Sequence, residues 1–226
     1  MLKNIKLVKK SEADSSYKRN LKFYNNISNK FQTDNIVKLL EISKIKATSV
    51  LEIGCADGGK LNLYKKHFES NNKNVKCWGV DLSKKAIQSG KKKYPELNLI
   101  NCSSLEITKL KKKFDLIICG CFLYLLDREY IFEQFDKITK SLNDNGYLII
   151  FDFEPLFPHY NSHRNKKIYS YKMNYTNFLE QSNYYKLIYK YKWDLEDRFN
   201  KKFLDSNISV NLFRKISFEK FFPKNI

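Results

Sequence analysis

Short apolar segments alternate with amphipathic helical segments in the middle of the chain, and no other sequence feature constrains the fold as strongly. Five apolar segments are typical of strands: residues 49–53, 75–80, 97–102, 114–119 and 147–153. Three of the intervening stretches, within residues 58–68, 83–94 and 127–142, carry apolar residues at helical spacing. Strands that are apolar throughout and alternate with helices predict a parallel sheet covered on both faces.

The alternation ends after residue 153. Residues 154–183 are aromatic and polar, and only a short helix near residues 175–180 is predicted there. Residues 184–193 and 208–216 have the composition of two further strands, and the short polar connection between them requires antiparallel pairing. We therefore predict an α/β fold: a doubly wound, seven-stranded, mostly parallel sheet with a C-terminal antiparallel hairpin.

The remaining sequence is expected to precede this sheet as a helical lead-in over residues 1–44. Residues 1–15 are polar and are expected to be frayed. Residues 17–43 show a continuous helical pattern with apolar side chains on one face. Residues 45–226 are predicted to form the main domain, with residues 154–183 as an insertion on its substrate side.

The chain carries a formal net charge of +18, which would suit nucleic acid, an anionic membrane or phosphorylated substrates as partners. The lysines, however, are spread along the whole chain, and the densest runs, at residues 91–93 and 111–113, flank predicted strands. A solvated surface is therefore favoured over a nucleic-acid site.

Other classes of protein are disfavoured by what the sequence contains. No apolar run approaches 18 residues, so no membrane span is predicted and a cytoplasmic location is expected. The five cysteines are odd in number and show no CxxC spacing, which argues against a disulfide framework and against a metal site.

A glycine-rich segment follows the first predicted strand and opens the first predicted helix. Its small residues would let the backbone approach a ligand, and the helix start would offer free N–H groups. The segment fits a dinucleotide fingerprint at Gly54, Ala56 and Gly59. A second interpretation uses two flanking acids. Glu52, inside the strand, can organise an ammonium group, and Asp81, at the end of the second strand, can accept ribose hydroxyls.

Four motifs in order give a resemblance to the class I, Rossmann-like, S-adenosylmethionine-dependent methyltransferases over about residues 45–153. The matching positions are Glu52, Gly54, Ala56 and Gly58 in the first motif, Gly79 to Ser83 in the second, Phe114 to Cys119 in the fourth-strand motif, and Gly146 before the fifth strand. Residues 148–175 further resemble a bacterial subgroup associated with surface-glycan gene clusters.

This resemblance implies S-adenosylmethionine as the cofactor. The cofactor-binding residues that it implies are Glu52, Gly54, Cys55, Ala56, Gly58, Asp81, Leu82, Cys102, Ser103 and Cys119. One departure from the family stands after the third strand, where an acidic residue often meets the adenine amino group. Here the stretch is Asn101 to Ser104, so a backbone carbonyl or the Ser103 hydroxyl would have to serve.

The resemblance also implies methyl transfer by in-line displacement to a small-molecule or glycan-type acceptor, such as a sugar or sugar nucleotide. The alternative is an RNA methyltransferase that uses the basic surface. A nicotinamide-dependent oxidoreductase and a non-catalytic binding module are weaker hypotheses, and no oligomeric state is predicted. Tyr124, after the fourth strand, and His159 and His163, after the fifth, are the catalytic candidates, with Arg164 as a partner for an anionic group.

Overall fold

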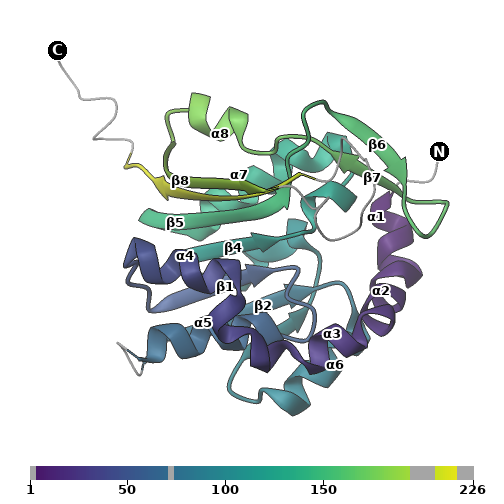
Figure 1. Cartoon of the computed structure of the whole chain (residues 1–226), viewed down its shortest axis with the longest axis horizontal. Coiled ribbons are helices and arrows are strands. Elements are labelled where there is room, and N and C mark those ends of the chain that lie inside the picture. The colour runs from purple at the N-terminus through teal and green to yellow at the C-terminus, as the bar shows by residue number, and fades with distance from the viewer. Residues whose placement is uncertain (1–3, 71–73, 194–206, 218–226) are drawn as a thin grey trace.

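The computed structural model describes residues 4–70, 74–193 and 207–217, which form a central sheet with helices on both faces (Figure 1). The sheet has the strand order β3-β2-β1-β4-β5-β9-β8. Its strands are β1 (Ser49–Ile53), β2 (Lys76–Asp81), β3 (Asn98–Asn101), β4 (Phe114–Gly120), β5 (Leu142–Phe153), β8 (Tyr185–Trp193) and β9 (Ile208–Lys215). Strands β1 to β5 pair in parallel, and β9 pairs antiparallel with β5 and β8. The predicted fold class is confirmed.

Both faces of the sheet are apolar, so alternate residues of one strand pack into different clusters. In β4, Leu116 and Ile118 belong to one cluster, whereas Ile117 and Cys119 belong to the other. The first cluster includes side chains of α4 (Asn35–Ser43), α5 (Gly59–Glu69) and α6 (Lys84–Lys93). The second includes side chains of the 3₁₀ segment η3 (Ser104–Leu110), α7 (Ile131–Ser141) and α8 (Asn177–Gln181). This two-sided packing explains why the strands lack polar alternation.

The insertion contains more regular structure than the sequence predicts. The helix expected near residues 175–180 is present as α8, but a hairpin of β6 (His159–Ser162) and β7 (Tyr169–Lys172) precedes it, outside the main sheet. Both strands are four residues long and rich in polar side chains, so they lack the apolar run by which strands are predicted.

The N-terminal segment is ordered from residue 4 onward, and the prediction of fraying is wrong for residues 4–15. It runs through α1 (Asn4–Leu7), the π-helical turn η1 (Val8–Glu12) and α2 (Ala13–Arg19). The Asn4 amide donates to Tyr169 O (2.6 Å) and to Leu125 O (3.2 Å), and the Asn4 backbone N–H donates to Asp127 Oδ1 (3.0 Å). These contacts attach the start of the chain to β7 and to the loop after β4.

The single helix predicted over residues 17–43 is divided into shorter pieces, namely α2, α3 (Leu21–Asn25), the 3₁₀ segment η2 (Ile27–Thr33) and α4. The divisions fall at Asn20, Asn26 and Asp34. The amides of Asn20 and Asn26 donate to the carbonyls of Ser16 and Lys22, and such side-chain bonds compete with the helix backbone. Asp34 accepts hydrogen bonds from two backbone N–H groups of α4 and caps that helix. As a result, α1 to α3 arch along one side of the molecule, from the β6–β7 hairpin to α6 (Figure 1).

Within the described residues, none of the helices combines the length and the apolarity that crossing a membrane requires.

Helix α6 packs directly against the turn between β1 and α5. A Cβ atom added at Gly90 would lie 2.3 Å from the backbone oxygen of Asp57 and 2.5 Å from Leu99 Cδ1. Contacts this short with backbone cannot be relieved by rotating a side chain, so only glycine allows α6 to lie so close to the turn.

We predict that Gly90→Ala lowers the thermal unfolding temperature and destabilises the protein by about 1–3 kcal/mol. In an unobstructed helix the same change would stabilise by about 1 kcal/mol, so the expected sign is opposite to that of helix propensity. Gln88→Ala, at an exposed position of the same helix, is the control. A Gly90→Ala protein at least as stable as the wild type would contradict the packing described here.

Candidate functional site

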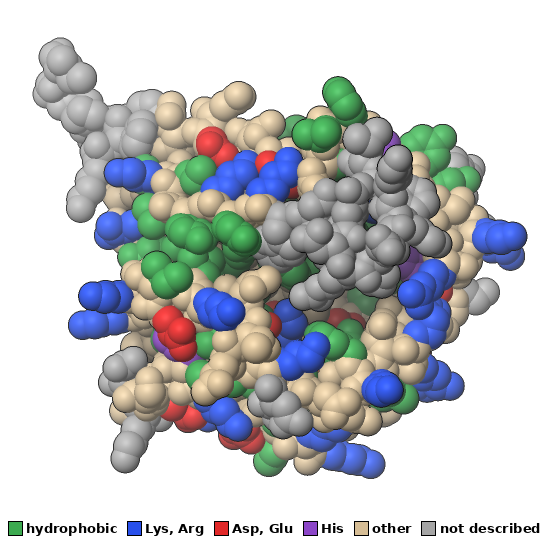
Figure 2. Space-filling model, viewed as in Figure 1, with side chains coloured by type: hydrophobic (Ala, Val, Ile, Leu, Met, Phe, Trp, Pro, Cys, Tyr) green, Lys and Arg blue, Asp and Glu red, His purple; other side chains and the backbone are tan. Residues whose placement is uncertain are grey.

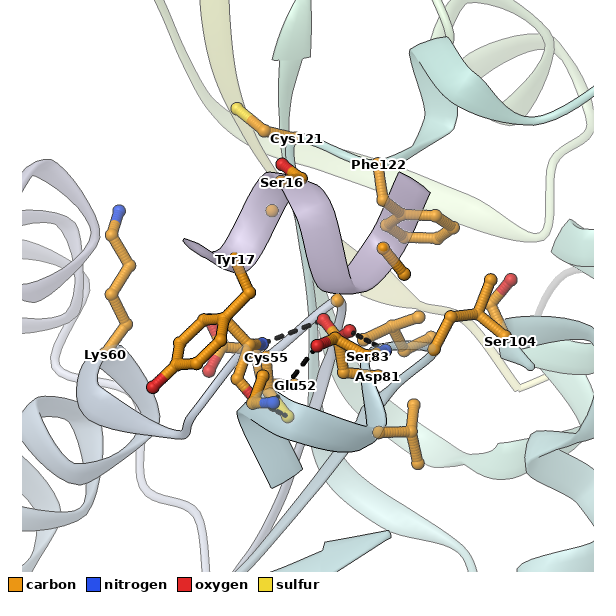
Figure 3. A pocket seen from close by; sticks show the side chains of 18 of the residues that line it. Ser16, Tyr17, Glu52, Cys55, Lys60, Asp81, Ser83, Ser104, Cys121 and Phe122 are labelled. Atoms are coloured by element: carbon orange, nitrogen blue, oxygen red, sulfur yellow. Dashed lines mark hydrogen bonds between the residues drawn. The ribbon is translucent and has the colours of Figure 1, made fainter. Parts of the chain in front are cut away.

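A cavity of about 410 Å³ opens at the carboxyl ends of the central strands, beneath the N-terminal helices (Figure 3). The strands and the loops that follow them supply Glu52 to Ala56, Val80 to Ser83, Cys102 to Ser104, Gly120 to Phe122, and Phe151. The N-terminal helices supply the opposite wall, which includes Ser16, Tyr17 and Tyr24. The volume is within the range of small-molecule sites.

The glycine-rich turn forms the floor of this cavity. Gly54 and Ala56 have φ angles of +79° and +50°, and the backbone N–H groups of Gly54 and Cys55 both donate to Val80 O (2.9 and 3.1 Å). A positive φ is inexpensive for glycine and strained for alanine, and the hydrogen bond from Ala56 N–H to Asp81 Oδ2 helps to hold Ala56 in place. The turn thereby brings the ends of β1 and β2 together at the cavity wall.

Asp81 connects the turn to the start of α6. Its Oδ2 accepts a hydrogen bond from the Ala56 backbone N–H (2.9 Å), and its Oδ1 accepts one from Ser83 N–H (2.7 Å). Burial raises the pKa of this carboxyl. A carboxylate has about four lone-pair positions, so two remain for a ligand's hydroxyl groups.

Ser103 and Cys102 line the cavity beyond Asp81. The Ser103 hydroxyl oxygen accepts a hydrogen bond from Leu105 N–H (3.3 Å), and Glu106 bonds back to the Ser103 backbone in a capping box at the start of η3. Since its oxygen is engaged as an acceptor, the Ser103 hydroxyl keeps its proton as a donor for a ligand.

Glu52 is the most unusual group in the cavity. Its side chain is 3% exposed, and its Oε2 has no hydrogen-bond partner among the described residues. Burial raises the pKa of Glu52 to about 8, although the nearby Lys60 ammonium opposes this shift. A buried carboxyl without a partner is costly, so this position is prepared for a cationic or hydrogen-donating ligand group.

The structure brings most of the predicted site residues to the cavity. Those that line it are Glu52, Gly54, Cys55, Ala56, Asp81, Leu82, Cys102, Ser103 and Tyr124. Gly58 and Cys119 stand just outside the lining. Gly58 precedes α5 with a φ of +79°, and Cys119 is buried in the apolar cluster below Gly120. Each is next in sequence to a lining residue, Gly59 and Gly120 respectively.

His159 and His163 lie on and beside the β6–β7 hairpin and are not among the cavity-lining residues. The Nδ1 atom of His159 is 2.8 Å from Phe157 O, within hydrogen-bonding distance. His163 Nδ1 lies 3.7 Å from Glu12 Oε1, and burial lowers the pKa of His163. His163 thus contacts the N-terminal segment.

The sequence does not predict the wall that the N-terminal helices supply. The Tyr17 ring stacks on Tyr24 with centroids 5.3 Å apart, and the Tyr17 hydroxyl donates to Asp57 Oδ2 (3.3 Å). Lys60, in the first turn of α5, also lines the cavity. The aromatic residues of the predicted helix at 17–43 were a usable signal, but they equally fit a helix face packed on a core.

The chain is similar in sequence to a known family of domains and to a protein from another organism. A family model described as a methyltransferase domain matches residues 44–198. The uncharacterized protein RP789 of Rickettsia prowazekii (strain Madrid E) is 29% identical over 131 residues, which are 55% of this chain and 23% of that protein. The chain therefore spans about a quarter of that relative's length.

Two solved structures share the fold. The N-methyltransferase NodS from Bradyrhizobium japonicum WM9 superposes with a TM-score of 0.58 at 19% identity, over 84% of this chain and 98% of that one. The magnesium protoporphyrin IX methyltransferase (ChlM) from Synechocystis PCC 6803, solved with bound SAM, gives a TM-score of 0.66 at 14% identity, over 95% and 98%. At these identities the likeness shows a common architecture.

The buried Glu52 carboxyl gives a prediction about pH. Its folded-state pKa lies above the ordinary value of 4.5, so between pH 4.5 and about 8 the folded protein holds a proton that the unfolded chain has released. Glu52 must therefore make the ligand-free protein less stable as the pH rises through this window. The free energy of unfolding of Glu52→Gln, relative to that of the wild type, should therefore increase between pH 5 and pH 8. We expect this increase to be at least about 1.4 kcal/mol, the value of one pKa unit. Denaturant unfolding at pH 5 and pH 8 measures the difference, and a pH-independent difference would contradict it.

Proposed function

The chain belongs to the family of methyltransferase domains, and on that premise we propose that it transfers the methyl group of S-adenosylmethionine to a small-molecule acceptor. The methyl group of this cofactor is attached to a sulfonium and is already a reactive electrophile. The protein then has to hold cofactor and acceptor in line and to exclude water, and such positioning can lower a barrier by about 7–11 kcal/mol.

The residues of the cavity fit this cofactor. We assign the ribose hydroxyls to Asp81, whose carboxylate retains acceptor capacity toward the cavity. Leu82, Cys102 and Ser103 line the part of the cavity next to Asp81, where the adenine would lie. Glu52 offers its unpartnered oxygen to the ammonium group. The observation that carries the proposal is the presence of Glu52, the glycine-rich turn and Asp81 along one cavity.

A small acceptor is favoured by the wall that the N-terminal helices form. Tyr17, Phe23 and Tyr24 line the cavity on the side opposite the strands, and a volume of about 410 Å³ suits a small molecule. Lys and Arg side chains are spread over the visible face of the molecule in Figure 2, and that face does not show the single basic patch that binding of RNA there would need. Sugars and sugar nucleotides remain the first acceptor class to test, because the exposed Tyr160 ring packs against Tyr169 on the hairpin and offers a stacking surface.

Tyr124 is the proposed catalytic residue that lines the cavity. Its ring packs edge-on against Phe153 with centroids 5.1 Å apart. The loop that carries it is held by Asp152, whose Oδ2 accepts a hydrogen bond from Leu123 N–H (2.9 Å). Burial raises the pKa of Tyr124, so its hydroxyl stays protonated and can donate a hydrogen bond to the acceptor. We propose that His159 and His163 contact parts of the acceptor that extend beyond the cavity.

Calorimetric titration tests the cofactor assignment. We expect the wild type to bind S-adenosylmethionine and S-adenosylhomocysteine but not NAD, and Asp81→Ala to weaken both by roughly 10- to 100-fold, as for hydrogen bonds to a charged group. Asp136→Ala, on the exposed face of α7, is the matched control. If the wild type binds neither S-adenosylmethionine nor S-adenosylhomocysteine, or if it prefers NAD, the proposed function is refuted.

Steady-state kinetics with an acceptor found by screening separates the catalytic candidates. Tyr124→Phe removes only the hydroxyl, and we expect kcat to fall by at least about 10-fold with KM little changed. We expect the double variant His159→Ala, His163→Ala to raise KM for the acceptor and to leave kcat nearly unchanged, because neither ring lines the cavity. If KM and kcat of the double variant both equal those of the wild type, the two histidines have no role in the reaction.

A further inference from the structure

Three polar side chains from β1 and α5 line one part of the cavity: Glu52, Lys60 and Tyr64. Figure 3 shows Lys60 and Ser104 at opposite ends of the pocket, with Asp81 between them. Lys60 therefore lies at the end away from the residues assigned to adenine.

The hydrogen-bonding capacity of this group is only partly used. Tyr64 is fully buried, and its hydroxyl has no hydrogen-bond partner in the part of the chain that the structure describes; the same is true of Glu52 Oε2. A buried hydroxyl and a buried carboxyl oxygen in this state are rare in native proteins and call for a partner. Since both groups line the same cavity, a bound ligand is the natural source of that partner.

Lys60 is held beside these two groups by two contacts. Its Nζ lies 3.3 Å from Asp34 Oδ2 and 5.3 Å from the centre of the Phe151 ring. The other oxygen of Asp34 is occupied by the backbone N–H groups of Ile36 and Val37 at the start of α4. An ammonium has three donors, so the ion pair with Asp34 leaves Lys60 able to donate to a ligand as well.

This set of groups selects among ligand chemistries. A phosphate would be attracted by Lys60 but repelled by Glu52 once that carboxyl is ionised, and a neutral hydroxyl compound would leave the Lys60 charge unmatched. A group that carries an ammonium and a carboxylate on one carbon atom matches both signs of charge. It also supplies an acceptor for the Tyr64 hydroxyl.

We propose that Lys60 and Tyr64 bind the carboxylate of an α-amino-acid group whose ammonium binds Glu52. The proposal rests on the function proposed above, because S-adenosylmethionine ends in such a group. It assigns the two ends of the cavity to the two ends of one molecule, with the nucleoside at Asp81 and Ser103 and the amino acid at Lys60. Lys60 and Tyr64 are then specificity residues for the cofactor.

Two ligands that differ only in the amino-acid group provide the test. S-adenosylhomocysteine contains this group, whereas 5′-methylthioadenosine has the same nucleoside and thioether without it. We expect Lys60→Met to weaken S-adenosylhomocysteine by roughly 10- to 100-fold, as for a charge-assisted hydrogen bond, and to leave the Kd of 5′-methylthioadenosine unchanged. Lys66→Met, at an exposed lysine of the same helix, is the control and should change neither Kd.

Tyr64→Phe adds a readout that separates binding from folding. Because the Tyr64 hydroxyl has no partner in the ligand-free protein, its removal should leave the Tm unchanged or higher while S-adenosylhomocysteine binds several-fold more weakly. A hydroxyl with a purely structural role would instead lower the Tm and leave the ratio of the two affinities unchanged.

Failure of the amino-acid subsite and failure of the proposed function would give different binding results. If the wild type binds S-adenosylhomocysteine and Lys60→Met binds it equally well, the amino-acid subsite is wrong although the cofactor is right. If Lys60→Met weakens both ligands by the same factor, Lys60 acts on the cavity as a whole and the subsite is again wrong. Failure of the wild type to bind either ligand refutes the proposed function itself.

Discussion

The buried carboxylate of Asp57 joins the parts of the molecule that make the cavity. It is completely shielded from solvent and accepts hydrogen bonds from Gly59 N–H (3.2 Å), the Tyr17 hydroxyl (3.3 Å) and Lys93 Nζ (2.8 Å). These donors belong to the start of α5, to α2 and to α6 respectively. A buried charge is tolerated only when it is paired and hydrogen-bonded, so each of these elements must be in place for the others to be stable. Asp57 therefore connects α2 to α5 and α6 beside the cavity.

The three carboxyl groups near the turn, Asp57, Asp81 and Glu52, differ in how fully the protein satisfies their hydrogen bonds. Asp57 and Asp81 are satisfied by backbone and side-chain donors of the protein, whereas Glu52 has an oxygen that the described residues leave unpartnered. The first two stabilise the turn between β1 and α5 before any ligand arrives. Glu52 instead carries a cost in the ligand-free protein that a ligand would remove. A ligand that binds Glu52 would therefore stabilise the folded protein by removing this cost.

The sequence predicted the sheet because its signals are local. Apolar runs such as residues 114–119 and the small residues of the β1–α5 turn need no knowledge of distant partners. The wall over the cavity depends on contacts that sequence spacing does not reveal, such as that of Tyr17 with Asp57, forty residues later. The β6–β7 hairpin was missed for a related reason, since its strands are short and polar and it is the tertiary setting that defines them. Asp81 and Glu52 were found because their place relative to a glycine turn is itself a local pattern.

The attachment of Asn4 bears on the order in which the molecule assembles. Its partners are Leu125, Asp127 and Tyr169, separated from it by 121 to 165 positions in the chain. Contacts so distant in sequence form late, because the intervening chain must first lose its freedom. The N-terminal wall of the cavity is therefore expected to dock after the strands have paired, because neighbouring strands such as β1 and β4 are closer in sequence.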